Sequence, residues 1–249
     1  MFDDDTSPAR RDFLRKSLTL IPVVTLASTG LSSSTFAQTP ASDAAQASAA
    51  RPAVVAGDYT PTFFTPEEWA FVIAACDRLI PSDHVGPGAV ELGVPEFLDR
   101  HMQTPYANGA IWYMQGPFLE AAPEFGYQGR LNLRDTLRIG IKAMDAYSKK
   151  TFSGKAFAEL PTAQQEDLLK SAEAGKLGLE DIASKLFFTS LLNEVRNGYF
   201  ADPSHGGNKH MGAWKMIGYP GMRADYMDWI TVRDTPYPLP PVDLAGRRG

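Results

Sequence analysis

The histidines and the aspartates beside them are the residues whose types and spacing could do chemistry. Asp83 and His84 precede a glycine-rich loop, and Asp202, His205 and His210 lie together in a second loop. Imidazole and carboxylate groups bind metals and transfer protons, so one hypothesis is a stand-alone enzyme with a site built from both loops. These histidines lack the i, i+4 spacing that presents two imidazoles to one ion. Solvated loop histidines are the alternative, and we expect no metal in this chain.

Other self-contained catalytic motifs do not occur in the sequence. No Gly-x-Gly-x-x-Gly follows an expected strand, which leaves a dinucleotide-binding fold unsupported. Cys76 is the only cysteine, so covalent haem c and cysteine-ligated clusters are excluded, as is an intramolecular disulfide. Neither Gly-x-Ser-x-Gly nor His-Glu-x-x-His is present. We therefore expect no catalytic residue and no cofactor in this chain.

The charge balance limits the partners. The 249 residues include 24 Lys and Arg against 29 Asp and Glu, which gives a formal net charge of −5 at pH 7. Nucleic acids and anionic lipids are bound by concentrated basic side chains. We expect no nucleic-acid partner for this mildly acidic chain.

Helical patterns dominate the sequence after residue 60. In the stretch TPEEWAFVIAACDRLIP, Thr65 can cap a helix, Pro66 suits its first turn and Glu68 completes a capping box. Cys76 lies on the apolar face of this helix, where we interpret it as a buried structural thiol. Thr162 is expected to cap a later helix in the same way, with Gln165 at the box position. Further helices are expected within residues 95–103, 131–152, 160–176 and 179–200.

These patterns together predict an all-α fold. The helix within residues 179–200 is the most apolar, which indicates a central place in the core. Neither strand alternation nor a long internal repeat is apparent. The prediction is an irregular bundle of about five or six helices with long Gly/Pro-rich loops, forming a single domain over residues 61–240 with a tail at 241–249. Residues 105–130 are rich in glycine and aromatic residues and show no helical period.

The beginning of the chain has the features of an export signal. The order Arg-Arg-x-Phe-Leu resembles the signal that the twin-arginine translocase recognises on folded proteins. Its residues are Arg10, Arg11, Phe13 and Leu14. An uncharged, weakly apolar segment follows, so we predict a removable signal peptide over residues 1–37 and a periplasmic location. An ordinary secretory signal with a chance arginine pair is the alternative. Residues 38–60, rich in Ala, Ser and Pro, predict a linker.

Residues 198–221, GYFADPSHGGNKHMGAWKMIGYPG, combine six glycines with four aromatic residues. Glycine lets the backbone approach another surface closely, and aromatic side chains anchor many interfaces. Two interpretations are open: the block binds a partner, or it folds back and closes the chain's own core. The candidate interface residues are Tyr199, Phe200, Gly206, Gly207, Asn208, Trp214, Tyr219 and Pro220.

Three stretches resemble the gluconate 2-dehydrogenase subunit 3 family. They are the leader, the block LIPSDHVGPGAVELGVPEFL at residues 79–98, and the glycine- and aromatic-rich block at residues 198–221. The last contains Gly-Tyr-Phe, Asp-Pro, Gly-Gly-Asn, Trp-Lys and Ile-Gly-Tyr-Pro-Gly in the family's order. A Leu-Pro, Gln-Gln and Leu-Leu pattern at residues 160–169 also fits. The likeness covers about residues 60–225.

The resemblance implies a small, non-catalytic subunit of a flavin-dependent sugar or sugar-acid dehydrogenase. It implies FAD in a large catalytic subunit and haem c in a multihaem cytochrome c subunit, through which the complex would associate with the membrane. The small subunit would carry the export signal and bind the large one, and the family assigns it no catalytic residue. A stand-alone enzyme using the loop histidines and aspartates, and a structural binding protein without a dehydrogenase partner, are the alternative hypotheses.

Overall fold

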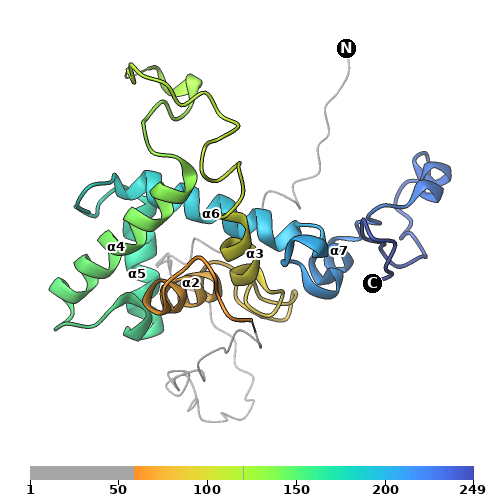
Figure 1. The fold of residues 1–249 in the computed structure, drawn as a ribbon. Helices are drawn as coiled ribbons and strands as arrows, with labels where there is room; N and C mark the ends of the chain where they lie inside the picture. Colours follow the sequence, from red (N-terminus) through yellow and green to blue (C-terminus); the bar gives the residue numbers. More distant parts are fainter. Residues whose placement is uncertain (1–58, 120) are drawn as a thin grey trace, which may run out of the picture. The chain divides into compact units, whose positions relative to one another are not determined.

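The described part of the chain is built from α-helices and short 3-10 turns (Figure 1). The structure is a computed structural model that describes residues 59–119 and 121–249. The predicted signal peptide, with Arg10, Arg11, Phe13 and Leu14, and nearly all of the predicted linker lie outside these residues. Within them the chain has six α-helices and only isolated β-bridges, which confirms the predicted all-α fold. No helix in this part of the chain is both long and apolar enough to cross a membrane.

Five helices lie close to the predicted ranges, with shifted ends, and α7 lies where no helix was predicted. The α-helices are α2 (Pro66–Leu79), α3 (Val94–His101), α4 (Leu133–Thr151), α5 (Thr162–Glu173), α6 (Ser184–Phe200) and α7 (Gly212–Ile217). The 3-10 helices are Pro123–Phe125, Phe157–Glu159, Pro203–His205, Lys209–Met211 and Ala224–Trp229.

Helix α2 begins as the sequence predicts. The Thr65 hydroxyl accepts the Glu68 backbone N–H at 3.3 Å, and the Glu68 carboxylate accepts the Thr65 N–H at 3.0 Å. The same carboxylate accepts a hydrogen bond from Arg138 of α4 at 3.0 Å, so this cap also ties two helices together. Cys76 is fully buried, and burial raises the pKa of its thiol far above the ordinary value, which agrees with a structural role.

The predicted cap of α5 is wrong. Pro161 occupies the cap position, and Thr162 is already the first helical residue. Gln165 turns inward and donates to the carbonyl oxygen of Phe157 at 3.1 Å. A buried carbonyl needs a donor, and this requirement, rather than the start of the helix, determines where the Gln165 side chain points.

Helix α6 is the central element, with α3, α4 and α5 packed against it. Two glycines permit this packing. A Cβ atom on Gly140 of α4 would collide with the ring of Phe187, and a Cβ atom on Gly198 of α6 would lie 2.6 Å from the ring of Phe97. Both positions therefore require glycine because a neighbouring aromatic ring fills the space.

Asp99 of α3 fixes the segment that leads into α2. Its fully buried carboxylate accepts the backbone N–H groups of Thr62, Phe63 and Phe64 and the hydroxyl of Tyr59, at 2.8 to 3.0 Å. Burial alone would raise the pKa of Asp99, but these donors outweigh it and the pKa lies below its ordinary value. The chain before α2 is thus held by an ionised, fully hydrogen-bonded carboxylate.

Two long segments leave the helices. We call residues 103–131, between α3 and α4, the aromatic loop; it is the yellow-green segment of Figure 1. Residues 218–240, which follow α7, are the C-terminal arm. Residues 241–249, expected to form a tail, return to the loop that follows α6, because the Leu244 N–H donates to Asp202 Oδ2 at 2.8 Å. Within this segment the buried Asp243 accepts from Arg247 at 2.5 Å.

Candidate partner-binding site

The glycine- and aromatic-rich block folds back on the end of α6. Gly207 approaches α6 so closely that a Cβ atom would collide with the carbonyl of Gly198. The buried Asn208 side chain donates to the Ala201 carbonyl and accepts the Ala213 N–H, both at 2.9 Å. Trp214 Nε1 donates to the carbonyl of Phe200 at 2.9 Å. The polar groups of these residues are therefore satisfied within the chain.

Exposure divides the candidate interface residues of this block. The buried members are Tyr199, Gly206, Gly207, Asn208 and Trp214. Phe200 is 42% exposed and Tyr219 is 41% exposed, while Pro220 is partly buried. The chain's own packing accounts for the buried members, which favours the interpretation that the block closes the core. Partner contacts by Phe200 and Tyr219 stay a prediction.

The loop histidines and aspartates are not assembled into a site. The exposed histidines are His84, His205 and His210. Asp83 accepts the N–H of Val85 within its own loop at 2.8 Å, and Asp202 accepts the N–H of Leu244 at 2.8 Å. In residues 59–119 and 121–249, no three His, Cys, Asp or Glu side chains are grouped so that they could hold a metal ion. The hypothesis of a metal site built from these two loops has no geometric support.

The aromatic loop carries a group of exposed apolar side chains that sequence reasoning missed. They are Tyr106, Ile111, Trp112, Tyr113, Phe118, Leu119, Phe125 and Tyr127. Tyr113 is 85% exposed and Phe125 is 72% exposed. Contiguous apolar side chains on a surface mark sites of interaction. The sequence feature that could have indicated this surface is the density of aromatic residues in a stretch without helical periodicity.

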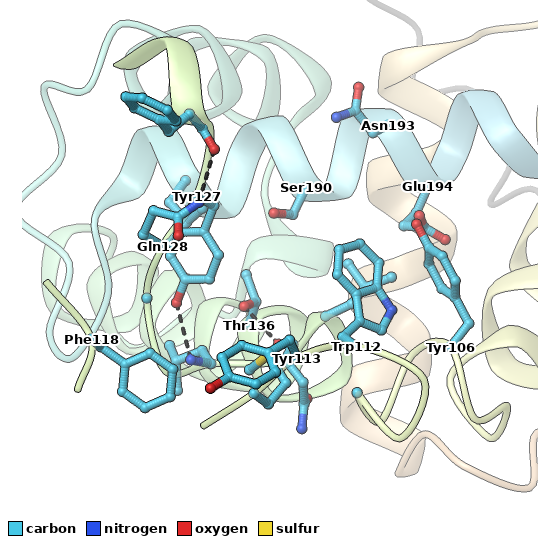
Figure 2. Close-up of a pocket in the computed structure, with 18 of the residues that line it drawn as sticks. Tyr106, Trp112, Tyr113, Phe118, Tyr127, Gln128, Thr136, Ser190, Asn193 and Glu194 are labelled. Atoms are coloured by element: carbon cyan, nitrogen blue, oxygen red, sulfur yellow. Dashed lines mark hydrogen bonds between the residues drawn. The ribbon is translucent and has the colours of Figure 1, made fainter. Parts of the chain in front are cut away.

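Hydrogen bonds and ring contacts order the loop. Asn132 donates to the carbonyl of Asn108 at 3.1 Å, which holds the loop near its return to α4. Gln128 donates to the carbonyl of Phe125 at 2.8 Å, as Figure 2 shows. At the other end, the Tyr106 ring lies 5.0 Å from the Trp112 ring in an edge-to-face arrangement.

The aromatic loop, α6 and the start of α4 line an open hollow of about 1270 Å³ (Figure 2). Figure 2 shows aromatic side chains of the loop lying beneath α6. Loop residues that line the hollow include Tyr106, Trp112, Tyr113, Phe118 and Tyr127. Residues of α6 that line it include Ser190, Asn193, Glu194 and Phe200. The hollow therefore combines aromatic walls with polar groups, several of which come from α6.

Glu194 is a buried carboxyl group in this hollow, with only 3% of the residue exposed. Its Oε1 accepts from Asn197 Nδ2 at 3.0 Å. Its Oε2 has no hydrogen-bond donor among the described residues. His101 Nε2 lies 3.4 Å away, within ion-pair distance but without hydrogen-bond geometry.

Burial also shifts the pKa values of Glu194 and His101. It raises the pKa of Glu194 to about 7, against the opposing effect of the hydrogen bond from Asn197. Burial lowers the pKa of His101, and the nearby His205 lowers it further. Since both shifts favour the uncharged forms, we consider this contact a weak ion pair at most. The hollow therefore contains a carboxyl group that titrates near neutral pH.

The Glu194→Gln variant tests this assignment through stability. Because the pKa of Glu194 is higher in the folded chain than its ordinary value of 4.5, the folded chain binds more protons between about pH 4.5 and 7. The stability that Glu194 contributes should fall as pH rises through that window. We expect the variant to be more stable than the wild type at pH 8 by ~3 kcal/mol, with little difference at pH 4.5.

Urea unfolding of both proteins at the two pH values measures this. The difference between them isolates Glu194, because the other groups titrate in both proteins. If the two proteins differed in the free energy of unfolding by the same amount at pH 4.5 and at pH 8, the raised pKa of Glu194 would be contradicted.

An exposed group of apolar side chains such as that of the aromatic loop is typical of an interaction surface. The model of the gluconate 2-dehydrogenase subunit 3 family matches residues 66–221, and the chain belongs to this family. The match spans α2 to α7 and includes the aromatic loop and Glu194. Membership assigns the chain to the accessory subunits of multi-subunit dehydrogenases. Comparison with curated proteins and with solved structures finds no match.

Proposed function

We propose that this chain is the non-catalytic small subunit of a periplasmic, flavin-dependent sugar or sugar-acid dehydrogenase. A large subunit that binds FAD would oxidise the CH–OH group, and a multihaem cytochrome c subunit would accept the electrons. The small chain would carry the twin-arginine signal for itself and for the large subunit, which it binds and stabilises. Family membership supports the accessory role, and the leader supports export.

The exposed aromatic loop is the observation that carries the binding role. A large aromatic side chain buries about 150–250 Å² when it is covered, and each square ångström of apolar surface removed from water contributes about 25 cal/mol. Because hydrogen bonds already order much of the loop, docking would cost less conformational entropy than docking a flexible segment. A large partner that covers this surface would gain substantial binding free energy.

The position of the loop within the family match supports the same role. The C-terminal arm also has exposed apolar side chains, among them Met227 and Ile230. Most of the arm follows residue 221, where the match ends, whereas the whole aromatic loop lies inside it. We therefore place the main contact with the large subunit on the aromatic loop.

Substitution of Trp112 and Tyr113 by serine tests this surface. Both side chains are at least half exposed, so their loss should leave the stability of the free chain nearly unchanged. A buried aromatic anchor contributes ~2 kcal/mol or more to binding, so the double variant should bind the large subunit at least ~30-fold more weakly. Affinity measurements with the purified flavin-containing subunit provide the check.

Val85→Ser is the matched control, because Val85 is exposed but lies outside the aromatic loop. Unchanged affinity of the Trp112/Tyr113 variant would move the interface to another surface, such as that of Phe200 and Tyr219. If the wild-type chain bound no flavin-containing subunit, the proposed function itself would be wrong.

Deletion of residues 1–37 tests the export role. We expect the large subunit to stay in the cytoplasm or to lose activity, measured by dehydrogenase assays on cell fractions. A variant with both Arg10→Lys and Arg11→Lys keeps the positive charge but lacks the arginine pair, so it separates a twin-arginine signal from an ordinary secretory one. Export of the lysine variant would support the ordinary signal. Normal periplasmic activity after the deletion would contradict the export role, provided that the large subunit has no signal of its own.

A further inference from the structure

The free oxygen of Glu194 is the feature of the hollow that the family does not explain. Only 3% of Glu194 is exposed, and its Oε2 has no hydrogen-bond donor in the described part of the chain. A buried acceptor without a donor destabilises the folded chain, and a charged acceptor does so more strongly. A ligand that supplied this donor would therefore gain binding free energy at this atom.

The surroundings of Glu194 indicate the chemistry of that ligand. The hollow is lined by the rings of Tyr106, Trp112 and Phe200. Aromatic faces attract cations, most strongly where water is excluded. Arg196 is the other charged residue among the described residues of the lining, and it is exposed to solvent. The buried titratable group available to a ligand is thus a carboxyl group, which a cation would stabilise in its ionised form.

We propose that the hollow receives a basic side chain of the large subunit, a guanidinium or ammonium group that draws Glu194 Oε2, which is covered in the free chain, into a hydrogen bond between the aromatic walls. This inference rests on the proposed function, since the partner is the large subunit of that complex. An apolar side chain would fill the same space but leave Oε2 without a donor. A basic group supplies the donor and neutralises the buried carboxylate.

The environment of His101 fits this arrangement. The His101 ring stacks on Phe97 with centroids 5.1 Å apart and lies 5.3 Å from the ring of Tyr106. Packed in this way, the imidazole forms a fixed wall beside Glu194. Burial disfavours its charged form, so it competes weakly for the carboxylate. An incoming cation would be the stronger partner for Glu194.

The test compares wild-type chain, Glu194→Gln and Glu173→Gln for binding to the purified large flavin-containing subunit. Glutamine has nearly the shape of glutamate but no charge. Glu173 is exposed at the end of α5, so its variant removes one negative charge outside the hollow. Removing one partner of a buried charge pair is expected to weaken binding ~30-fold or more for Glu194→Gln, with less than about a twofold change for Glu173→Gln.

Stability and binding together decide between the outcomes. Thermal unfolding should show that Glu194→Gln is folded and at least as stable as the wild type, so that weaker binding reflects the lost contact. Wild-type affinity in Glu194→Gln would overturn this inference and leave the proposed function intact. Equal weakening by both variants would indicate general electrostatic attraction and would also overturn it. Failure of the wild-type chain to bind would refute the proposed function and this inference with it.

Discussion

The close packing of α6 against α3 and α4 is the constraint on which the rest of the structure depends. It is set by two glycines, Gly140 and Gly198, each facing an aromatic ring that leaves no room for a side chain. One face of α6 thus closes the core, and another lines the hollow with Ser190, Asn193 and Glu194. A change in the position of α6 would alter both. The core and the candidate binding site are parts of one packing arrangement.

The sequence predicts a structural feature correctly where interactions between residues close in sequence determine it. The capping box at Thr65 and Glu68 needs only residues three apart, and it forms as predicted. The predicted cap at Thr162 is wrong because the Gln165 side chain donates to the buried carbonyl of Phe157 instead. This carbonyl is buried only when the helices are packed together. Helix α6 begins at Ser184, later than its apolar pattern suggests, after a turn in which Asp181 has a positive φ of 64°.

The candidate site was harder to predict, for a physical reason. Glycine and aromatic residues have the same sequence pattern whether the rings pack on their own core or on a partner. In residues 198–221 two of the four aromatic side chains, Tyr199 and Trp214, are buried, whereas in the aromatic loop residues such as Tyr113 face solvent. Glu194 resembles any polar position on a helix, because the residues that surround it, such as His101 of α3, are distant in sequence. Only the folded chain distinguishes these cases.

Hydrogen–deuterium exchange of the chain, free and bound to the large flavin-containing subunit, tests the central claim most directly. The claim is that the aromatic loop and the adjoining face of α6 bind that subunit. Binding should slow amide exchange across residues 103–131 and around Glu194, with smaller changes along α5, which contributes no residue to the hollow. A stable complex in which the loop exchanges as fast as in the free chain would contradict the account.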